Sequence, residues 1–471
     1  MQSNIQLFFL DKRSQFHLDT ISKISSDQPE VRLIVVDVGA FDYPLQAPWR
    51  VPAIFGSGSK SLSKMFETLG VEYVDASRIT PIAHSWGPDE QRKMDLAVKS
   101  TMISWFRRVS GPERMPGVLD KFIQRLITSQ SRRVFRVSID VIEKYAPSKV
   151  YIENGRFAVS HSSYLAALRL GCEIVFPEIQ SDTRRLYLRD YRVHDRVAMQ
   201  KHAMDITAGI PRSEISAHSD HWIAEWRPQN SKLNPFTNLW TAPENSWEGP
   251  RESLALFATS SSDETASLDL NWEQASWETQ LVAFQAVWDK IKPRGLSPVL
   301  RVHPNLLNKH PMAARQEIRE IREFERNNPE FVIVWASSPV STYELMSYSS
   351  IVIVHNSTVG LEACLDGIPV ICTNSCAFDL ISDVTSVFSP HDLSKIDDIS
   401  PVADAFGAQR FIAALEVSHE IVPPNSHGVD ISNVPRYRLL LESIRTGAIF
   451  SMAFEKRWHL YRRIVSWLSP S

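Results

Sequence analysis

The sequence HNSTVGLEACLDGIPV, residues 355–370, decides the fold of this 471-residue chain. It follows the apolar run at 351–354, which is typical of a buried strand in a parallel sheet, and the next such strand begins at Val370. Between the two strands, small polar residues lead into a segment that has the pattern of a short helix. This order of strand, polar turn and helix predicts an α/β fold with a ligand site at the carboxyl end of the strand.

The polar turn formed by Asn356, Ser357 and Thr358 suits a phosphate group. N–H groups in the first turn of a helix have no partner inside the helix, and the helix dipole is positive there. Glu362 lies one turn further on, where its carboxylate can reach the hydroxyls of a ribose. The alternative is an ordinary junction in which the serine and threonine only cap the helix. The polar cluster and the glutamate together favour a nucleotide site.

Composition and charge exclude several classes of protein. The net charge of −3 provides no general attraction for nucleic acid, so nucleic acid is not an expected partner. The chain has 4 cysteines in or beside apolar stretches, which argues against a disulfide scaffold and favours the cytoplasm. Cys372 and Cys376 lack the second pair that a zinc site needs, so no metal is expected. No apolar run approaches the length of a membrane span.

Length and pattern predict two domains. Strands and helices alternate from residue 150 to residue 176, and a second series begins at residue 254. The intervening segment 227–250 is rich in Pro, Asn and Ser and has no periodicity. We therefore expect an N-terminal domain at 1–228, a linker at 229–250, a C-terminal domain at 251–432 and a helical segment at 433–471.

Further polar residues follow predicted strands of the second domain. His303 comes directly after a strand and before Pro304, which stiffens the turn. A histidine in this place can donate to a phosphate and stabilise the charge of a leaving group. Arg301 precedes it on the same strand face and can bind that phosphate or an acidic neighbour. Ser260 and Ser261 follow another strand, where they either contact a phosphate or cap a helix.

Strand ends of the first domain carry a second set of candidates. Asn154, Gly155 and Arg156 follow one predicted strand, Glu178 follows the next, and Asp37 ends an earlier one. Ligands of parallel α/β sheets bind at these ends, so we assign the residues to the acceptor side. Glu178 is the candidate general base for an acceptor hydroxyl, and Arg156 is the candidate group that orients an anionic acceptor.

The motifs FATSSSDE, RVHPN and NSTVGLEACLDGIPVI, preceded by YIENGRFA and FPE, resemble a known family. They are similar to capsule and surface-polysaccharide glycosyltransferases of GT-B architecture, a group that includes bacterial Kdo transferases. The resemblance covers roughly residues 145–380. It implies two Rossmann-like domains whose parallel sheets face a central cleft, with a C-terminal helix that crosses back to the first domain.

The same resemblance implies a function. The C-terminal domain would bind a nucleotide-sugar, with His303 and the turn Asn356, Ser357 and Thr358 at its phosphate and Glu362 at its ribose. The enzyme would be independent of metals and would need no cofactor beyond this substrate, for which a CMP-linked sugar is one candidate. It would transfer the sugar to a glycan or a lipid-linked glycan in surface-polysaccharide biosynthesis.

Two other functions stay open. A non-hydrolysing sugar-nucleotide 2-epimerase has a similar two-domain form, but it would carry an Asp-Ser-Gly-Gly-like turn where this chain has Asn356 to Gly360. A non-catalytic member would bind the nucleotide or the glycan without turnover. The sequence leaves open the donor, the acceptor and whether the anomeric configuration is retained or inverted.

Basic and aromatic residues interleave near the C-terminus in FEKRWHLYRRIVSWL, residues 454–468. This pattern is typical of a helix that lies at a membrane surface. The aromatic residues equally suit a helix packed on the N-terminal domain, and we favour that role. We expect at most a weak peripheral contact with the inner face of the membrane, made through Arg462 and Arg463.

Overall fold

The structure is a computed structural model, and it divides the chain into two compact units. Among the described residues, unit 1 contains those up to Val193 and those from His419 onward, whereas unit 2 runs from Asp195 to Ser418. The residues that the structure describes are 4–11, 15–38, 59–106, 118–180, 184–193, 195–233, 247–261, 275–304, 306, 311–402 and 404–423.

The sheet of unit 1 has seven strands in the order β13-β6-β5-β4-β1-β2-β3. They are β1 (Ile5–Leu10), β2 (Arg32–Asp37), β3 (Glu72–Asp75), β4 (Lys149–Ile152), β5 (Glu173–Gln180), β6 (Arg185–Arg189) and β13 (His419–Ile421). Strands β1 to β5 pair in parallel, and β6 and β13 extend one edge in antiparallel fashion. The parallel part has the strand order of a Rossmann fold, in which strands are added on one side of β1 up to β3 and on its other side from β4 onward.

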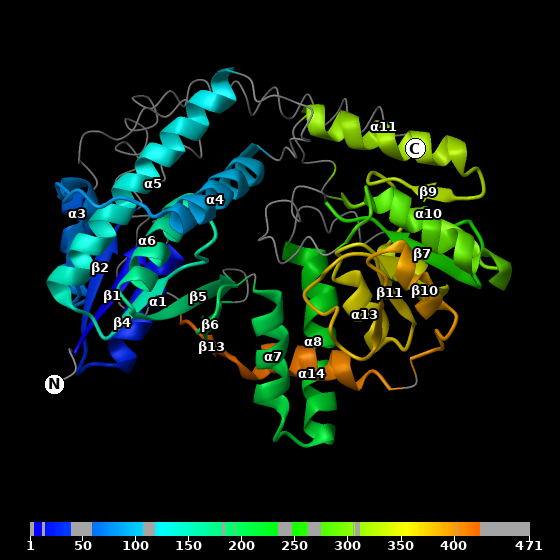
Figure 1. The fold of residues 1–471 in the computed structure, drawn as a ribbon. Helices are drawn as coiled ribbons and strands as arrows, with labels where there is room; N and C mark the ends of the chain where they lie inside the picture. Colours follow the sequence, from blue (N-terminus) through cyan, green and yellow to red (C-terminus); the bar gives the residue numbers. More distant parts are fainter. Residues whose placement is uncertain are drawn as a thin grey trace. The chain divides into compact units, whose positions relative to one another are not determined.

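Helices cover both faces of this sheet (Figure 1) because side chains along a strand alternate between its faces. Leu7 and Phe9 pack with residues of α4 (Pro88–Phe106), α5 (Val118–Tyr145) and α6 (Ala158–Arg169). Phe8 and Leu10 pack on the other face with α1 (Gln15–Asp27) and α3 (Ser59–Thr68). The apolar run of β1 is therefore buried on both sides, as expected for a central parallel strand.

The sheet of unit 2 has six parallel strands in the order β12-β11-β10-β7-β8-β9. They are β7 (Leu254–Ala258), β8 (Ser297–Arg301), β9 (Val332–Val334), β10 (Ser349–Val354), β11 (Val370–Cys372) and β12 (Val384–Ser386). This is again the Rossmann order, with the switch point between β7 and β10.

Both faces of the second sheet are also covered. Leu254 and Leu256 belong to a core that includes residues of α7, α8, α12, α13 and α14, and Ala255 and Phe257 belong to a core with residues of α10 and α11. These helices are α7 (Arg196–Thr207), α8 (Arg212–Leu233), α10 (Gln280–Ile291), α11 (Pro311–Asn327), α12 (Thr342–Ser347), α13 (Val359–Leu365) and α14 (Phe406–Val417). Short 3₁₀ helices are η2 (Ala76–Arg78), η5 (Lys292–Arg294) and η7 (Pro390–Ile396).

The predicted fold class is confirmed, since the chain is α/β and forms two Rossmann-like units with parallel strands. The division of the units differs from the expected boundary at residue 228, because α7 and α8 bury Ala203 and Trp222 in the core of unit 2. Helix α8 also continues to Leu233, past the expected start of the linker. Linker residues 234–246 and the C-terminal helical segment lie outside the described residues. Within the described residues, no helix combines the length and the apolarity that a membrane span requires.

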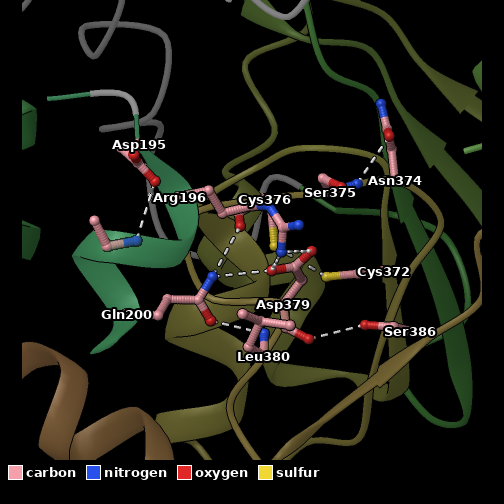
Figure 2. Close-up of polar contacts among 11 residues, drawn as sticks. Asp195, Arg196, Gln200, Cys372, Asn374, Ser375, Cys376, Asp379, Leu380 and Ser386 are labelled. Atoms are coloured by element: carbon pink, nitrogen blue, oxygen red, sulfur yellow. Dashed lines mark hydrogen bonds and ion pairs between the residues drawn. The ribbon is translucent and has the colours of Figure 1, made fainter. Parts of the chain in front are cut away.

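A buried ion pair fixes the start of α7 (Figure 2). Arg196 Nη1 donates to both carboxylate oxygens of Asp379, at 2.7 and 2.9 Å. Gln200 Nε2, one turn later, donates to Asp379 Oδ1 at 2.9 Å, and Gln200 Oε1 accepts the N–H of Leu380 at 2.7 Å. Ser386 Oγ donates to the backbone carbonyl of Asp379 at 2.9 Å. The network ties α7 to the loop that follows β11.

Candidate functional site

Polar residues meet at the carboxyl ends of neighbouring strands in unit 2. Ser260, after β7, accepts the backbone N–H of Asn356, after β10, at its Oγ over 2.8 Å. Thr259 Oγ1 accepts the backbone N–H of His303, after β8, at 2.8 Å. Strands β10, β7 and β8 are consecutive in the sheet, so these bonds join their ends across the switch point. The structure thus brings together three of the residues that were predicted to bind the donor.

Both predicted serines at the end of β7 are buried. Gln280 holds Ser260 from two sides, since its Oε1 accepts the serine N–H at 2.9 Å and its Nε2 donates to the serine carbonyl at 3.2 Å. The hydroxyl of Ser260 links two strand ends, as described above. Ser261 lies beside it, and its predicted phosphate contact stays a prediction.

The polar turn after β10 is accessible, whereas the glutamate behind it is not. Asn356 and Ser357 are partly exposed and Thr358 is exposed. Ser357 Oγ accepts the backbone N–H of Val359 at 3.4 Å, at the start of the 7-residue helix α13. Glu362 in that helix is only 2% exposed. The turn is therefore open to a ligand, while the ribose contact of Glu362 stays a prediction.

His355, the first residue of the same stretch, has a protonation state that its neighbours determine. Ser375 N–H donates to Asn374 Oδ1 at 2.8 Å, so Asn374 Nδ2 is the donor to His355 Nε2 at 3.3 Å. His355 Nδ1 then carries the proton and donates to Thr373 Oγ1 at 2.9 Å, and Thr373 donates to the carbonyl of Val354 at 3.3 Å. Burial lowers the pKa of His355 to about 4. The imidazole is thus neutral and oriented.

This arrangement makes stability depend on pH. Between the ordinary pKa of 6.5 and the folded value of about 4, the unfolded chain binds a proton at His355 that the folded chain does not bind. We expect stability to be fully present above this window and to fall as pH decreases through it. The shift corresponds to on the order of 3 kcal/mol.

Replacement of His355 by Gln, which does not titrate, is expected to reduce this pH dependence. Urea unfolding at about pH 7 and about pH 4.5 measures the change in the free energy of unfolding for each protein. His391→Gln is the control, because His391 is exposed. The same pH-dependent loss in wild type and in His355→Gln would contradict the assigned protonation state.

Arg301 is buried at 2% exposure beneath the same edge. Its Nη1 donates to the carbonyl of Trp335 at 2.7 Å, and its Nε donates to Thr342 Oγ1 at 3.4 Å. Burial lowers its pKa to about 10, which still leaves the side chain charged at neutral pH. Its Nη2 has no hydrogen-bond partner among the described residues. A phosphate contact, which stays a prediction, would have to use this group.

The predicted acceptor residues after β4 form a turn with unusual backbone angles. Asn154 and Gly155 have φ values of 60° and 64°. A Cβ at Gly155 would lie 2.8 Å from the ring of Phe176, so this position requires glycine. Asn154 Oδ1 accepts the N–H of Arg156 at 3.2 Å, and the Arg156 guanidinium lies 4.4 Å from the ring centroid of Phe157. One turn thus presents three predicted residues at the carboxyl end of β4.

Asp37 and Glu178 occupy different environments. Asp37 ends β2, is buried, and accepts the hydroxyl of Tyr73 at 2.6 Å. The prediction that Glu178 follows its strand is wrong: β5 continues to Gln180 because β6 pairs with it. Arg189 Nη1 lies 2.6 Å from Glu178 Oε2. Burial raises the pKa of Glu178, and the charge of Arg189 opposes this rise.

A largely buried cluster at the switch point of unit 1 was not expected from the sequence. Asp11 follows β1, Glu153 follows β4, and His17 lies in α1. Their ligand atoms lie within 4.8 Å of one another, and His17 Nε2 contacts Glu153 Oε2. Asp11 and Glu153 directly follow strands that the sequence reveals, which was the available signal. One imidazole and two carboxylates can hold a zinc or manganese ion, so the expected absence of a metal stays a prediction. A second group of this composition consists of His84, Asp140 and Glu143.

No protein-family model matches the chain. No curated protein matches it either. Similar solved structures include the β-Kdo 2,4 transferase of Thermosulfurimonas dismutans KpsC, at 10% identity, with 60% of this chain and 83% of that chain covered and a TM-score of 0.37. The β-Kdo 2,7 transferase of the same KpsC has 12% identity, coverage of 73% and 92%, and a TM-score of 0.36.

The UDP-GlcNAc 2-epimerase of Methanocaldococcus jannaschii, in complex with UDP-GlcNAc and UDP, is also similar. It has 11% identity and a TM-score of 0.28, with 88% of this chain and 99% of that chain covered. Kdo transferases of the predicted kind are thus among the similar structures.

Proposed function

We propose that the chain is a glycosyltransferase that moves a sugar from a nucleotide-sugar to a hydroxyl of a glycan or a lipid-linked glycan. The observation that carries the proposal is the hydrogen-bonded junction of the ends of β7, β8 and β10 at the switch point of unit 2. Rossmann-like sheets bind nucleotides at this edge. The accessible turn at Asn356 and Ser357 would receive the phosphate, and the imidazole of His303 would donate to it.

The acceptor is assigned to unit 1, where Arg156 lies in the turn after β4 and Glu178 lies within β5. Glu178 is our candidate for the general base, because burial raises its pKa and so makes its carboxylate a stronger base. Metal independence and a role in surface-polysaccharide synthesis belong to the same proposal and derive from the sequence resemblance. A place in the cytoplasm also belongs to it and derives from the cysteine content.

Thermal shift of the purified protein against a panel of CMP-, UDP- and GDP-sugars tests the proposal. We expect one nucleotide class to raise the melting temperature, since a ligand that binds only the folded state stabilises it. Stabilisation by none of them would overturn the proposal. Interconversion of a sugar nucleotide in the absence of an acceptor would support a 2-epimerase instead.

Glu178→Gln is expected to lower the rate of transfer by about 10²–10⁴, because glutamine cannot accept the proton of the acceptor hydroxyl. The wild-type rate should fall as pH decreases through the raised pKa of Glu178, and the variant should lack this dependence. Rates over a range of pH, with the donor identified by thermal shift, provide the measurement. Glu173→Gln on the same strand is the control. Full activity of Glu178→Gln at every pH would place the base elsewhere, with Glu153 and Asp37 as the next candidates.

A further inference from the structure

A groove in unit 1 is lined by none of the residues assigned to the donor or to catalysis. Its volume is about 550 Å³, which is within the range of pockets that bind small molecules. One side of it is α5, and the other is the segment that follows η2. The lining residues are Thr80, Pro81, Ser129, Arg132, Arg133 and Arg136.

The arginines of the groove are held in place by the segment that packs along α5. Arg132 lies with its guanidinium 5.1 Å from the ring centroid of Trp86, and its Nη2 donates to Gln91 Oε1 at 3.3 Å. Arg136 Nε donates to the carbonyl of His84 at 2.7 Å. Because at least one contact already orients each of these guanidinium groups, binding of an anion would cost less side-chain entropy than binding to freely moving arginines.

Arg133 is oriented in the same way, since its Nη2 donates to the carbonyl of Ser77 at 2.9 Å. The groove therefore gathers three guanidinium groups from about one turn of α5. Each has five N–H donors in a planar fork that matches a carboxylate or a phosphate.

Two arginines of the groove keep their positive charge without an ion pair to a carboxylate in the described part of the chain. Among the described residues, no carboxylate forms an ion pair with Arg132 or Arg136. Asp140 lies one turn further along α5, but its Oδ2 accepts the N–H of Ile82 at 2.9 Å and its Oδ1 lies 3.3 Å from His84 Nε2. The chain as a whole has a net charge of −3, so attraction of an anion to this place must come from the local cluster.

We propose that this groove binds an acidic glycan through at least two of its carboxylate or phosphate groups. Guanidinium groups spaced along one helix can engage successive charged units, and the hydroxyls of Thr80 and Ser129 can bond to sugar hydroxyls. Single-stranded nucleic acid would need aromatic rings for base stacking, and Arg132 already covers the ring of Trp86. The inference rests on the proposed function, because the bound glycan would be the acceptor of the transferred sugar. It adds that this acceptor is an anionic chain.

Isothermal titration of the full chain with an oligogalacturonate tests this inference. A neutral maltooligosaccharide of equal length and inorganic phosphate are titrated in parallel. We expect the wild type to bind the acidic oligomer and not the neutral one. Arg132→Gln/Arg136→Gln should weaken binding about tenfold or more, because two charge-assisted contacts are lost. Arg132→Lys/Arg136→Lys keeps the charge without the fork and should recover part of the affinity.

Arg315→Gln/Arg319→Gln is the matched control, because these exposed arginines have the same spacing on another helix, α11. This control should bind like the wild type, and thermal unfolding should show that all variants are folded. Equal affinity for both oligomers, unchanged affinity in Arg132→Gln/Arg136→Gln, or binding of phosphate alone would overturn the inference. Stabilisation by a nucleotide-sugar without binding of any acidic oligomer would overturn it while leaving the proposed function in place.

Discussion

Replacement of His303 by alanine is expected to slow sugar transfer by about 10²–10³, the usual effect of losing one donor that stabilises developing charge. The variant should remain folded, because the contact that places this residue at the strand end is made by its backbone N–H with Thr259 Oγ1. Alanine preserves that bond and removes only the imidazole. The rate of a single turnover, with the donor found by thermal shift, isolates the chemical step from product release.

Two comparisons make this test specific. His303→Asn keeps a side-chain donor and should recover part of the rate, whereas His391→Ala removes an exposed imidazole and should leave the rate unchanged. The affinity for the donor should change much less than the rate, since the contact is strongest when the leaving phosphate gains charge. A near-normal rate in His303→Ala would remove His303 from the mechanism.

The fold of both units was predictable because the sequence repeats one local pattern. Apolar runs such as the one that forms β10 are buried on both faces, which only central strands of parallel α/β sheets require. Helices between these runs then imply crossover connections and, with them, parallel pairing. The antiparallel strands β6 and β13 were less accessible to this reasoning, because β13 pairs with a strand more than two hundred residues earlier in the chain.

Reasoning from the local sequence alone also explains the wrong prediction for Glu178. Pro177 suggests the end of a strand, because proline cannot donate to a ladder. It lies in β5 opposite Leu188, at the antiparallel border of the sheet, and the strand continues past it. The residue at which a strand ends depends on the strands that pair with it, and the sequence of the strand alone does not reveal them.

The residues of the candidate site could be named from the sequence, but their contacts could not. Ser260 and Asn356 each follow a predicted strand, which marks them as edge residues. Their hydrogen bond spans 96 positions and depends on β7 and β10 being neighbours in the sheet. His355 shows the same limit, because its protonation state depends on Thr373 and Asn374 at the end of another strand.

A second large effect, on the stability of the fold, is expected when the buried pair of Arg196 and Asp379 is broken. Asp379→Ala is expected to lower the free energy of unfolding by about 3–5 kcal/mol, because it leaves a buried guanidinium without its counter-charge. The side chain of Asp379 is 0% exposed and that of Arg196 is 7% exposed, so water cannot readily replace the lost carboxylate. Gln200 would also lose the acceptor of its amide. Urea unfolding followed by tryptophan fluorescence measures the loss.

Asp205→Ala is the matched control, because Asp205 pairs with Lys201 on the same helix but is 63% exposed. A surface pair of this kind contributes about 0–1 kcal/mol. Replacement of both buried partners, Arg196→Met with Asp379→Leu, should recover most of the stability lost in Asp379→Ala, since no charge is then left buried. If Asp379→Ala and Asp205→Ala cost the same, the pair does not hold α7 against the loop after β11. Recovery in the double variant would show that the two buried charges can be replaced by apolar side chains of similar volume, and that stability is lost only when one charge remains without its partner and its space is left unfilled.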